Sequence, residues 1–139
     1  MSIRLILALS LMACSVVNAA PIKWNDEQAR DNANDVVKVI AKGEKDLKRA
    51  TSLGDTDGIF NLIMRPNARI LQSWREQREE LKNQAVDRFS GCFFALIDFN
   101  RYADTYSRSD SLMNDRNRSD YKRNYMTELK DCRDAVRHR

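Results

Sequence analysis

The fold follows from two stretches near the end of the chain, residues 92–106 (CFFALIDFNRYADTY) and residues 121–136 (YKRNYMTELKDCRDAV). In both stretches apolar side chains recur at steps of three and four residues, a spacing that places them on one face of an α-helix. In the second stretch that face carries Tyr121, Tyr125, Leu129, Cys132 and Val136. Each stretch also has one cysteine on its apolar face, so we predict two helices that pack against each other.

Cys92 and Cys132 are predicted to form a disulfide. Two cysteines on the apolar faces of neighbouring helices are expected to pair in an oxidising compartment, the alternative being buried free thiols. If the helices are antiparallel, the midpoint between the cysteines falls at Leu112. This position lies within residues 107–118, which are rich in Ser, Asp, Asn and Arg and are predicted to form the loop and the fraying start of the last helix. Composition, periodicity and cysteine spacing therefore predict the same helical hairpin.

The apolar stripe of the first stretch continues upstream and includes Trp74, Leu81, Ala85, Cys92, Phe99 and Ala103. Its period predicts one long central helix over about residues 67–106, with a bend near Gly91. In the register fixed by the cysteines, Phe99 lies opposite Tyr125.

An N-terminal helix is predicted to start at Asn25, because Asn is a good N-cap and Gln28 stands at the capping-box position. Its apolar face is made mostly of small residues: Ala29, Ala33, Val36, Ile40, Gly43, Leu47 and Ala50. Such a seam favours close packing along another helix. Gly54 is predicted to end the helix, with a turn at residues 55–58 (DTDG). Residues 59–64 (IFNLIM) are either a separate short helical turn or the first part of the next helix.

These patterns predict an all-α fold, a small bundle of three to four helices with a long central helix and a C-terminal antiparallel hairpin stapled by one disulfide. The 139 residues include only four Gly and two Pro, a composition that favours helices over turn-rich sheets. Residues 21–139 are long enough for one modest core and are predicted to form a single domain.

Residues 1–20 resemble a secretory signal peptide, with Arg4 ahead of a short apolar run and small residues at 18–20 (NAA). The run is shorter than the roughly 20 residues that span a membrane. Cleavage after Ala19 would give a periplasmic or secreted protein, and we expect this outcome. The alternative uses residues 11–14 (LMAC) as a loose lipobox, which would leave a membrane-tethered lipoprotein with its lipid anchor on Cys14.

Charge and residue content argue against several functions. Without Arg4 the chain has 23 basic and 20 acidic side chains, interspersed along its length, which supports nucleic-acid binding poorly. The only histidine, His138, stands next to the last residue, where a frayed terminus cannot position a general base. Paired cysteines leave no thiol for catalysis, and the ligand sets of zinc and calcium sites are missing. We therefore expect a non-catalytic protein without cofactor or metal.

The expected function is binding of another protein in the bacterial envelope, either within a secretion or conjugation apparatus or as an immunity or inhibitor protein. Aromatic and arginine side chains gather toward the tip of the predicted hairpin, a mixture that is enriched at protein interfaces. Phe94 stands out as an aromatic residue on the polar side of its helix. The candidate partner-binding residues are Phe94, Arg101, Tyr102, Tyr106, Arg108, Tyr121 and Arg123.

Two alternatives belong to other classes. A small cell-wall-active enzyme or lysis factor could use Glu76, Glu79 or Glu80 as its acid and base, although carboxylates interleaved with arginines are more typical of a solvated ion-pair face. A structural homo-oligomer could associate through the small-residue seam of residues 29–50. Asp98, a charge within an apolar run, is predicted to pair with Arg101 three residues on.

Overall fold

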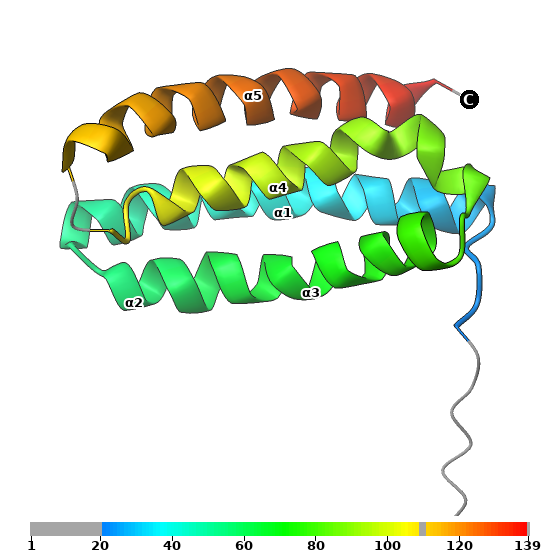
Figure 1. Ribbon diagram of the computed structural model, residues 1–139, viewed down its shortest axis with the longest axis horizontal. Helices are drawn as coiled ribbons and strands as arrows, with labels where there is room; N and C mark the ends of the chain where they lie inside the picture. The colour runs from blue at the N-terminus through cyan, green and yellow to red at the C-terminus, as the bar shows by residue number, and fades with distance from the viewer. Residues whose placement is uncertain (1–20, 109–110, 139) are drawn as a thin grey trace, which may run out of the picture.

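The computed structural model describes residues 21–108 and 111–138, except for the side chains of residues 111–114. The predicted signal peptide, with Cys14, lies outside this part. The described residues form helices and no strands. In chain order the elements are α1 (Asp26–Leu53), α2 (Thr56–Ile59), a π-helical turn (Phe60–Met64), α3 (Arg65–Arg75), a second π-helical turn (Glu76–Glu80), a 3₁₀ segment (Gln84–Phe89), α4 (Ser90–Asp104) and α5 (Ser111–Arg137). Figure 1 shows a bundle in which each long segment runs opposite to the one before it.

Helix α1 begins and ends where its sequence predicts. The Asn25 side chain accepts a hydrogen bond from the Gln28 backbone N–H at 2.8 Å, and the Gln28 side chain accepts one from the Asn25 N–H at 3.0 Å. Gly54 closes the helix with φ of +64°, a left-handed conformation that suits glycine. The predicted seam, residues 29–50, is the buried face of α1. Because this face is covered by the same chain, it is not available to a second copy.

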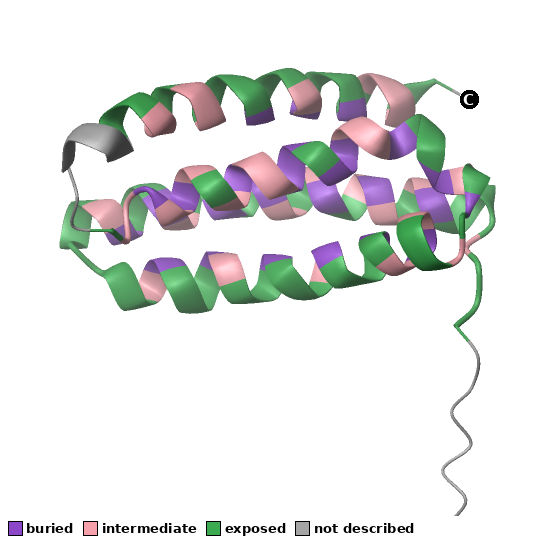
Figure 2. Cartoon of the chain, in the orientation of Figure 1, coloured by how far each residue is buried: buried purple, intermediate pink, exposed green. Residues whose placement is uncertain are grey.

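The core runs along the inside of the bundle (Figure 2). Trp74 of α3 and Phe99 of α4 are among its largest fully buried side chains. The Trp24 ring packs edge-on against Trp74 with 5.4 Å between ring centroids, which joins the segment before α1 to α3. Residues 56–80 form one helical run, so the cluster at residues 59–64 is not a separate element. Pro66 is the second residue of α3, just after the first π-helical turn of this run.

The prediction of one long helix over residues 67–106 is wrong, because the chain reverses direction after Glu80 (Figure 1). Lys82 adopts a left-handed backbone conformation with φ of +48°, which ends the helical path. The apolar stripes of α3 and α4 face the same core, and their residues therefore look like one continuous period. Gly91 marks no bend. A Cβ there would lie 3.1 Å from the Glu128 carbonyl oxygen, so this glycine permits close approach of α4 to α5.

Two buried amides hold the reversal. Asn83 Nδ2 donates to Gln77 Oε1 at 2.7 Å and to the Trp24 carbonyl at 2.9 Å. Gln77 in turn accepts from the Trp24 N–H at 2.9 Å and donates to the Ile22 carbonyl at 3.0 Å. Buried polar groups are stable only when they are paired in this way. The network therefore fixes the segment that precedes α1 against the turn between α3 and α4.

The predicted disulfide is confirmed, since Cys92 of α4 is bonded to Cys132 of α5 with the Cα atoms 4.6 Å apart. In line with the register that it sets, the Phe99 and Tyr125 rings lie 5.3 Å apart. Residues 107–118 were predicted to form the loop and the fraying start of the last helix, and most of them are helical, because α5 begins at Ser111.

Lys82 offers a test of the reversal. An L-residue with a side chain pays about 1 kcal/mol in the left-handed region, and glycine does not. Lys82→Gly should therefore raise the free energy of unfolding by up to about 1 kcal/mol, as measured by urea denaturation. Lys45→Gly, at an exposed position inside α1, is the matched control and should lower it by about 1 kcal/mol. Destabilisation by both substitutions would contradict the strained conformation at Lys82.

Candidate functional site

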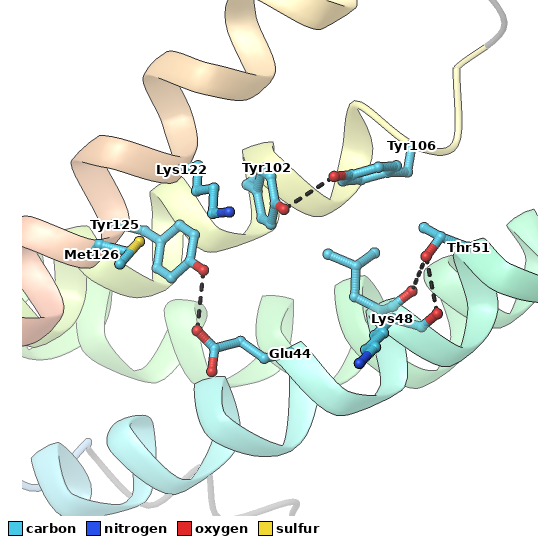
Figure 3. A pocket seen from close by; sticks show the side chains of 9 residues that line it. Glu44, Lys48, Thr51, Tyr102, Tyr106, Lys122, Tyr125 and Met126 are labelled. Atoms are coloured by element: carbon cyan, nitrogen blue, oxygen red, sulfur yellow. Dashed lines mark hydrogen bonds between the residues drawn. The ribbon is translucent and has the colours of Figure 1, made fainter.

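A cleft of about 390 Å³ lies between α1 and the α4–α5 pair (Figure 3). We call it the tyrosine cleft. It is lined by Glu44, Leu47, Lys48 and Thr51 of α1, by Tyr102 of α4 and Tyr106 of the turn that follows it, and by Lys122, Tyr125 and Met126 of α5. Tyr102 and Tyr106 share one face because they are four residues apart. Tyr125 reaches the cleft from across the hairpin, above Phe99.

Hydrogen bonds fix the phenols of the cleft. Tyr125 Oη donates to Glu44 Oε1 at 3.0 Å, and the hydroxyls of Tyr102 and Tyr106 are 3.0 Å apart (Figure 3). Burial raises the pKa of Tyr102, and its hydrogen bond to Tyr106 raises it further. Burial also raises the pKa of Tyr125, with the Glu44 carboxylate adding to the effect. At neutral pH the hydroxyls of Tyr102 and Tyr125 are therefore protonated, so they can serve as hydrogen-bond donors and acceptors but not as bases.

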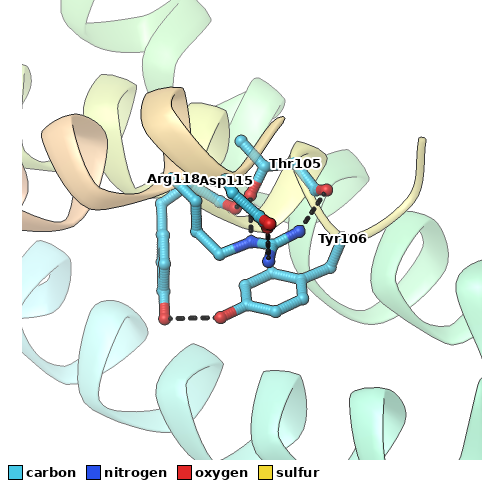
Figure 4. A network of polar contacts seen from close by, with 5 residues as sticks. Thr105, Tyr106, Asp115 and Arg118 are labelled. Atoms are coloured by element: carbon cyan, nitrogen blue, oxygen red, sulfur yellow. Dashed lines mark hydrogen bonds and ion pairs between the residues drawn. The ribbon is translucent and has the colours of Figure 1, made fainter. Parts of the chain in front are cut away.

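Arg118 holds the hairpin end beside the cleft (Figure 4). Its Nε donates to Thr105 Oγ1 at 3.2 Å and its Nη2 to the Thr105 carbonyl at 3.1 Å, while Nη1 donates to Asp115 Oδ1 at 2.8 Å. The guanidinium also stacks over the Tyr106 ring, 4.1 Å from the centroid. These contacts join the start of α5 to the end of α4, and they explain why a stretch of loop-like composition is helical.

The structure divides the predicted partner-binding residues among separate places. Tyr102 and Tyr106 line the tyrosine cleft. Arg101, Arg108 and Tyr121 line a different hollow of about 270 Å³ that also includes Asp104. In that hollow Arg101 forms the predicted salt bridge with Asp98, at 3.1 Å, and Arg108 is paired with Asp104.

The remaining two candidates line neither of these two hollows. Phe94 is 43% exposed beside Phe93, with the Arg78 guanidinium 5.4 Å from its ring centroid. Arg123 is exposed on α5 and bonded to Asp120 at 2.8 Å. The cleft residues that sequence reasoning missed are Glu44, Leu47, Lys48, Thr51, Lys122, Tyr125 and Met126. On α1, Leu47 belongs to the predicted small-residue seam, and the only signal for Glu44, Lys48 and Thr51 was their position beside it.

The residues considered for catalysis do not meet at the cleft. Glu76, Glu79 and Glu80 belong to the second π-helical turn, and none of them lines the cleft. His138 is exposed, and its carbonyl accepts a hydrogen bond from Arg88 at 3.0 Å. The described residues contain no group of His, Cys, Asp and Glu side chains placed to bind a metal ion. None of the described helices is long and apolar enough to cross a membrane.

Comparison of the chain with protein-family models, with curated proteins and with solved structures yields no match. The class of protein is therefore defined by fold and site alone. It is a small, disulfide-linked helical bundle that carries an open cleft lined by tyrosines.

The raised pKa of Tyr125 predicts a pH dependence. A phenol that holds its proton more tightly in the folded chain than in the unfolded chain stabilises the fold below about pH 10, the ordinary tyrosine pKa. That contribution is lost as the pH rises beyond this value. Tyr125→Phe should therefore lower stability at pH 8 by about 1 kcal/mol through loss of the bond to Glu44, and should lose less stability than the wild type between pH 9 and pH 11. Urea denaturation at each pH measures both effects, and identical pH profiles would refute the prediction.

Proposed function

We propose that this is an exported, non-catalytic protein of the bacterial envelope that acts by binding another protein through the tyrosine cleft. The observation that supports this most is the composition of the cleft. The side chains of Leu47 and Met126 and the rings of three tyrosines form apolar walls. The tyrosine hydroxyls, the Glu44 carboxylate and the lysine ammonium groups supply polar groups around these walls. Concave sites with aromatic walls and a few polar groups are typical of binding sites and of interface hot spots.

Further features of the chain support the proposal. The Cys92–Cys132 disulfide fits an oxidising compartment such as the periplasm. The hydrogen bonds of Arg118 tie α5 to Thr105 beside the cleft, and such preorganisation reduces the entropy that binding would cost. Met126 is 54% exposed at the edge of the cleft, so its apolar surface is accessible to a partner that binds there.

Capture from the native envelope tests this function. The tagged full-length chain is expressed in its host, crosslinked, purified without reductant and analysed by mass spectrometry. Met126→Asp places a charge at the cleft and should abolish recovery of a stoichiometric partner. Leu62→Asp is the matched control, because Leu62 is 52% exposed and does not line the cleft. Recovery of the bait alone from the wild type would refute protein binding, and equal recovery with Met126→Asp would refute the cleft as its site.

A further inference from the structure

We propose that the tyrosine cleft binds an acidic segment of the partner protein and takes up one apolar side chain of that segment. This inference rests on the proposed function and specifies the chemistry of the partner. It follows from the apolar floor of the cleft, from the charges at its mouth and from the basic surface of α5 that adjoins it.

The floor of the cleft calls for an apolar group. Leu47 and Tyr125 are buried at its base, and the exposed Met126 extends this apolar surface outward. The Tyr102 ring lies 5.4 Å from that of Tyr125, with 32° between their planes, and so forms a continuous aromatic wall. A volume near 390 Å³ is at the small end of ligand sites, and it suits one large side chain with its immediate neighbours better than an extended molecule.

The mouth of the cleft calls for negative charge. Lys48 on α1 and Lys122 on α5 both line it, and within residues 21–108 and 111–138 neither of them forms a salt bridge. The only carboxylate in the lining belongs to Glu44, and its Oε1 atom already accepts the Tyr125 hydroxyl. The mouth of the cleft therefore has two positively charged ammonium groups and one carboxylate, which already accepts a hydrogen bond.

Basic side chains continue along α5. A shallow apolar surface next to the cleft shares Lys122 and Met126 with it and is otherwise lined by Arg123, Lys130 and two hydroxyl residues, with no carboxylate. Arg123 is paired with Asp120 at 2.8 Å and Lys130 with Asp134 at 3.4 Å, so Lys122 is the basic group of this strip that forms no salt bridge among the described residues. A segment that extends from the cleft along α5 would meet this apolar strip, and acidic side chains beside its anchor would complement Lys48 and Lys122 and would also favour encounter.

The opposite polarity, a cationic group held by tyrosine rings and Glu44, fits less well. Cation binding uses the open faces of aromatic rings. The Arg118 guanidinium already covers a face of Tyr106, and Tyr102 and Tyr125 pack against each other. A cation would also be repelled by Lys48 and Lys122.

Selection from a phage-displayed library of short random peptides tests the proposal. The target is the protein purified from the periplasm after export of the full-length chain. We expect enriched peptides with a Trp, Phe, Leu or Met flanked by Asp and Glu. Their affinity is measured by fluorescence polarisation. The double variant Lys48→Gln, Lys122→Gln should bind them about tenfold more weakly or worse, because charge-assisted contacts are lost. At high salt the difference between the variant and the wild type should be smaller, because salt screens these contacts. Circular dichroism verifies that the variant is folded.

The variant Lys23→Gln, Lys45→Gln changes the net charge equally at exposed positions outside the cleft, and it should bind like the wild type. Enrichment of basic peptides that depend on Glu44, or of peptides indifferent to the Lys48 and Lys122 changes, would overturn the inference, as would a selection that enriches nothing. In any of these cases, the proposed function would still hold if the wild type captures a partner that Met126→Asp loses. The partner would then be recognised by groups other than an acidic segment.

Discussion

Replacement of both bonded cysteines, by Cys92→Ala and Cys132→Ala, is expected to lower the free energy of unfolding by about 4 kcal/mol. The bond closes a ring with a sequence separation of 40 residues, and its loss releases the closure entropy of that ring in the unfolded chain. Small domains have total stabilities of about 5–15 kcal/mol, so a large share would disappear. Both sulfurs are fully buried and Cys132 Sγ lies 3.9 Å from the Ala33 carbonyl of α1, so their removal also disturbs the contact between α1 and the hairpin.

Urea denaturation followed by circular dichroism measures this loss. The wild type supplies the control, because its buried disulfide should resist dithiothreitol under native conditions and become reducible only during unfolding. In the presence of reductant, the urea midpoint of the wild type should then approach the urea midpoint of the double alanine variant. A loss below about 1 kcal/mol would show that packing between α4 and α5 holds the hairpin without the bond. If the variant does not fold at all, the wild-type reduction experiment still decides the question.

Local signals in the sequence account for the parts of the fold that could be predicted. The start of α1 is specified by Asn25 with Gln28 and its end by Gly54, and all the groups involved lie within a few residues of each other. Pairing of Cys92 with Cys132 was also predictable, because two faces with helical period and a loop-like composition between them leave one antiparallel register.

The reversal after Glu80 was missed for a physical reason. It depends on Gln77 and Asn83, whose hydrogen bonds reach the backbone at Trp24 and Ile22, more than 50 residues away in sequence. No local pattern reports such partners, and Lys82 is a residue that rarely marks a left-handed turn. Two helices that line one core can keep a common apolar period across a break between them. Periodicity alone therefore cannot distinguish them from one long helix.

The sequence predicted no cleft, and only two of its lining residues, Tyr102 and Tyr106, were among the candidate partner-binding residues. Tyr102 and Tyr106 could be placed near the hairpin end from the helical period. Glu44 and Lys48 could not be assigned, because they join the cleft through the side of α1 that faces α5, and this depends on how α1 is rotated against the hairpin. Salt bridges three or four residues apart, such as that between Asp98 and Arg101, are local and were predictable.

Gly43→Ala is expected to lower the free energy of unfolding by about 2 kcal/mol, although alanine is the better helix former by about 1 kcal/mol. A Cβ at this position would lie 2.5 Å from Phe99 Cε1 and 2.8 Å from Cζ, well inside contact distance. The ring cannot move away easily, because Phe99 is fully buried and packs against the Tyr125 ring at 5.3 Å. The clash therefore outweighs the gain in helix propensity. Thermal and urea denaturation measure the net effect.

A double-mutant cycle with Phe99→Leu separates the clash from other causes. In the Phe99→Leu background Gly43→Ala should be neutral or stabilising by up to about 1 kcal/mol, since only the propensity gain remains. Gly54→Ala is the matched control: its cost comes from φ of +64° in open space and should be unchanged by Phe99→Leu. Equal costs of Gly43→Ala in both backgrounds would contradict the close contact.

Because Gly43 precedes Glu44 and Phe99 supports Tyr125, any outward shift of α1 that relieves the clash also widens the tyrosine cleft. Gly43→Ala should therefore weaken peptide binding, whereas Gly54→Ala should not.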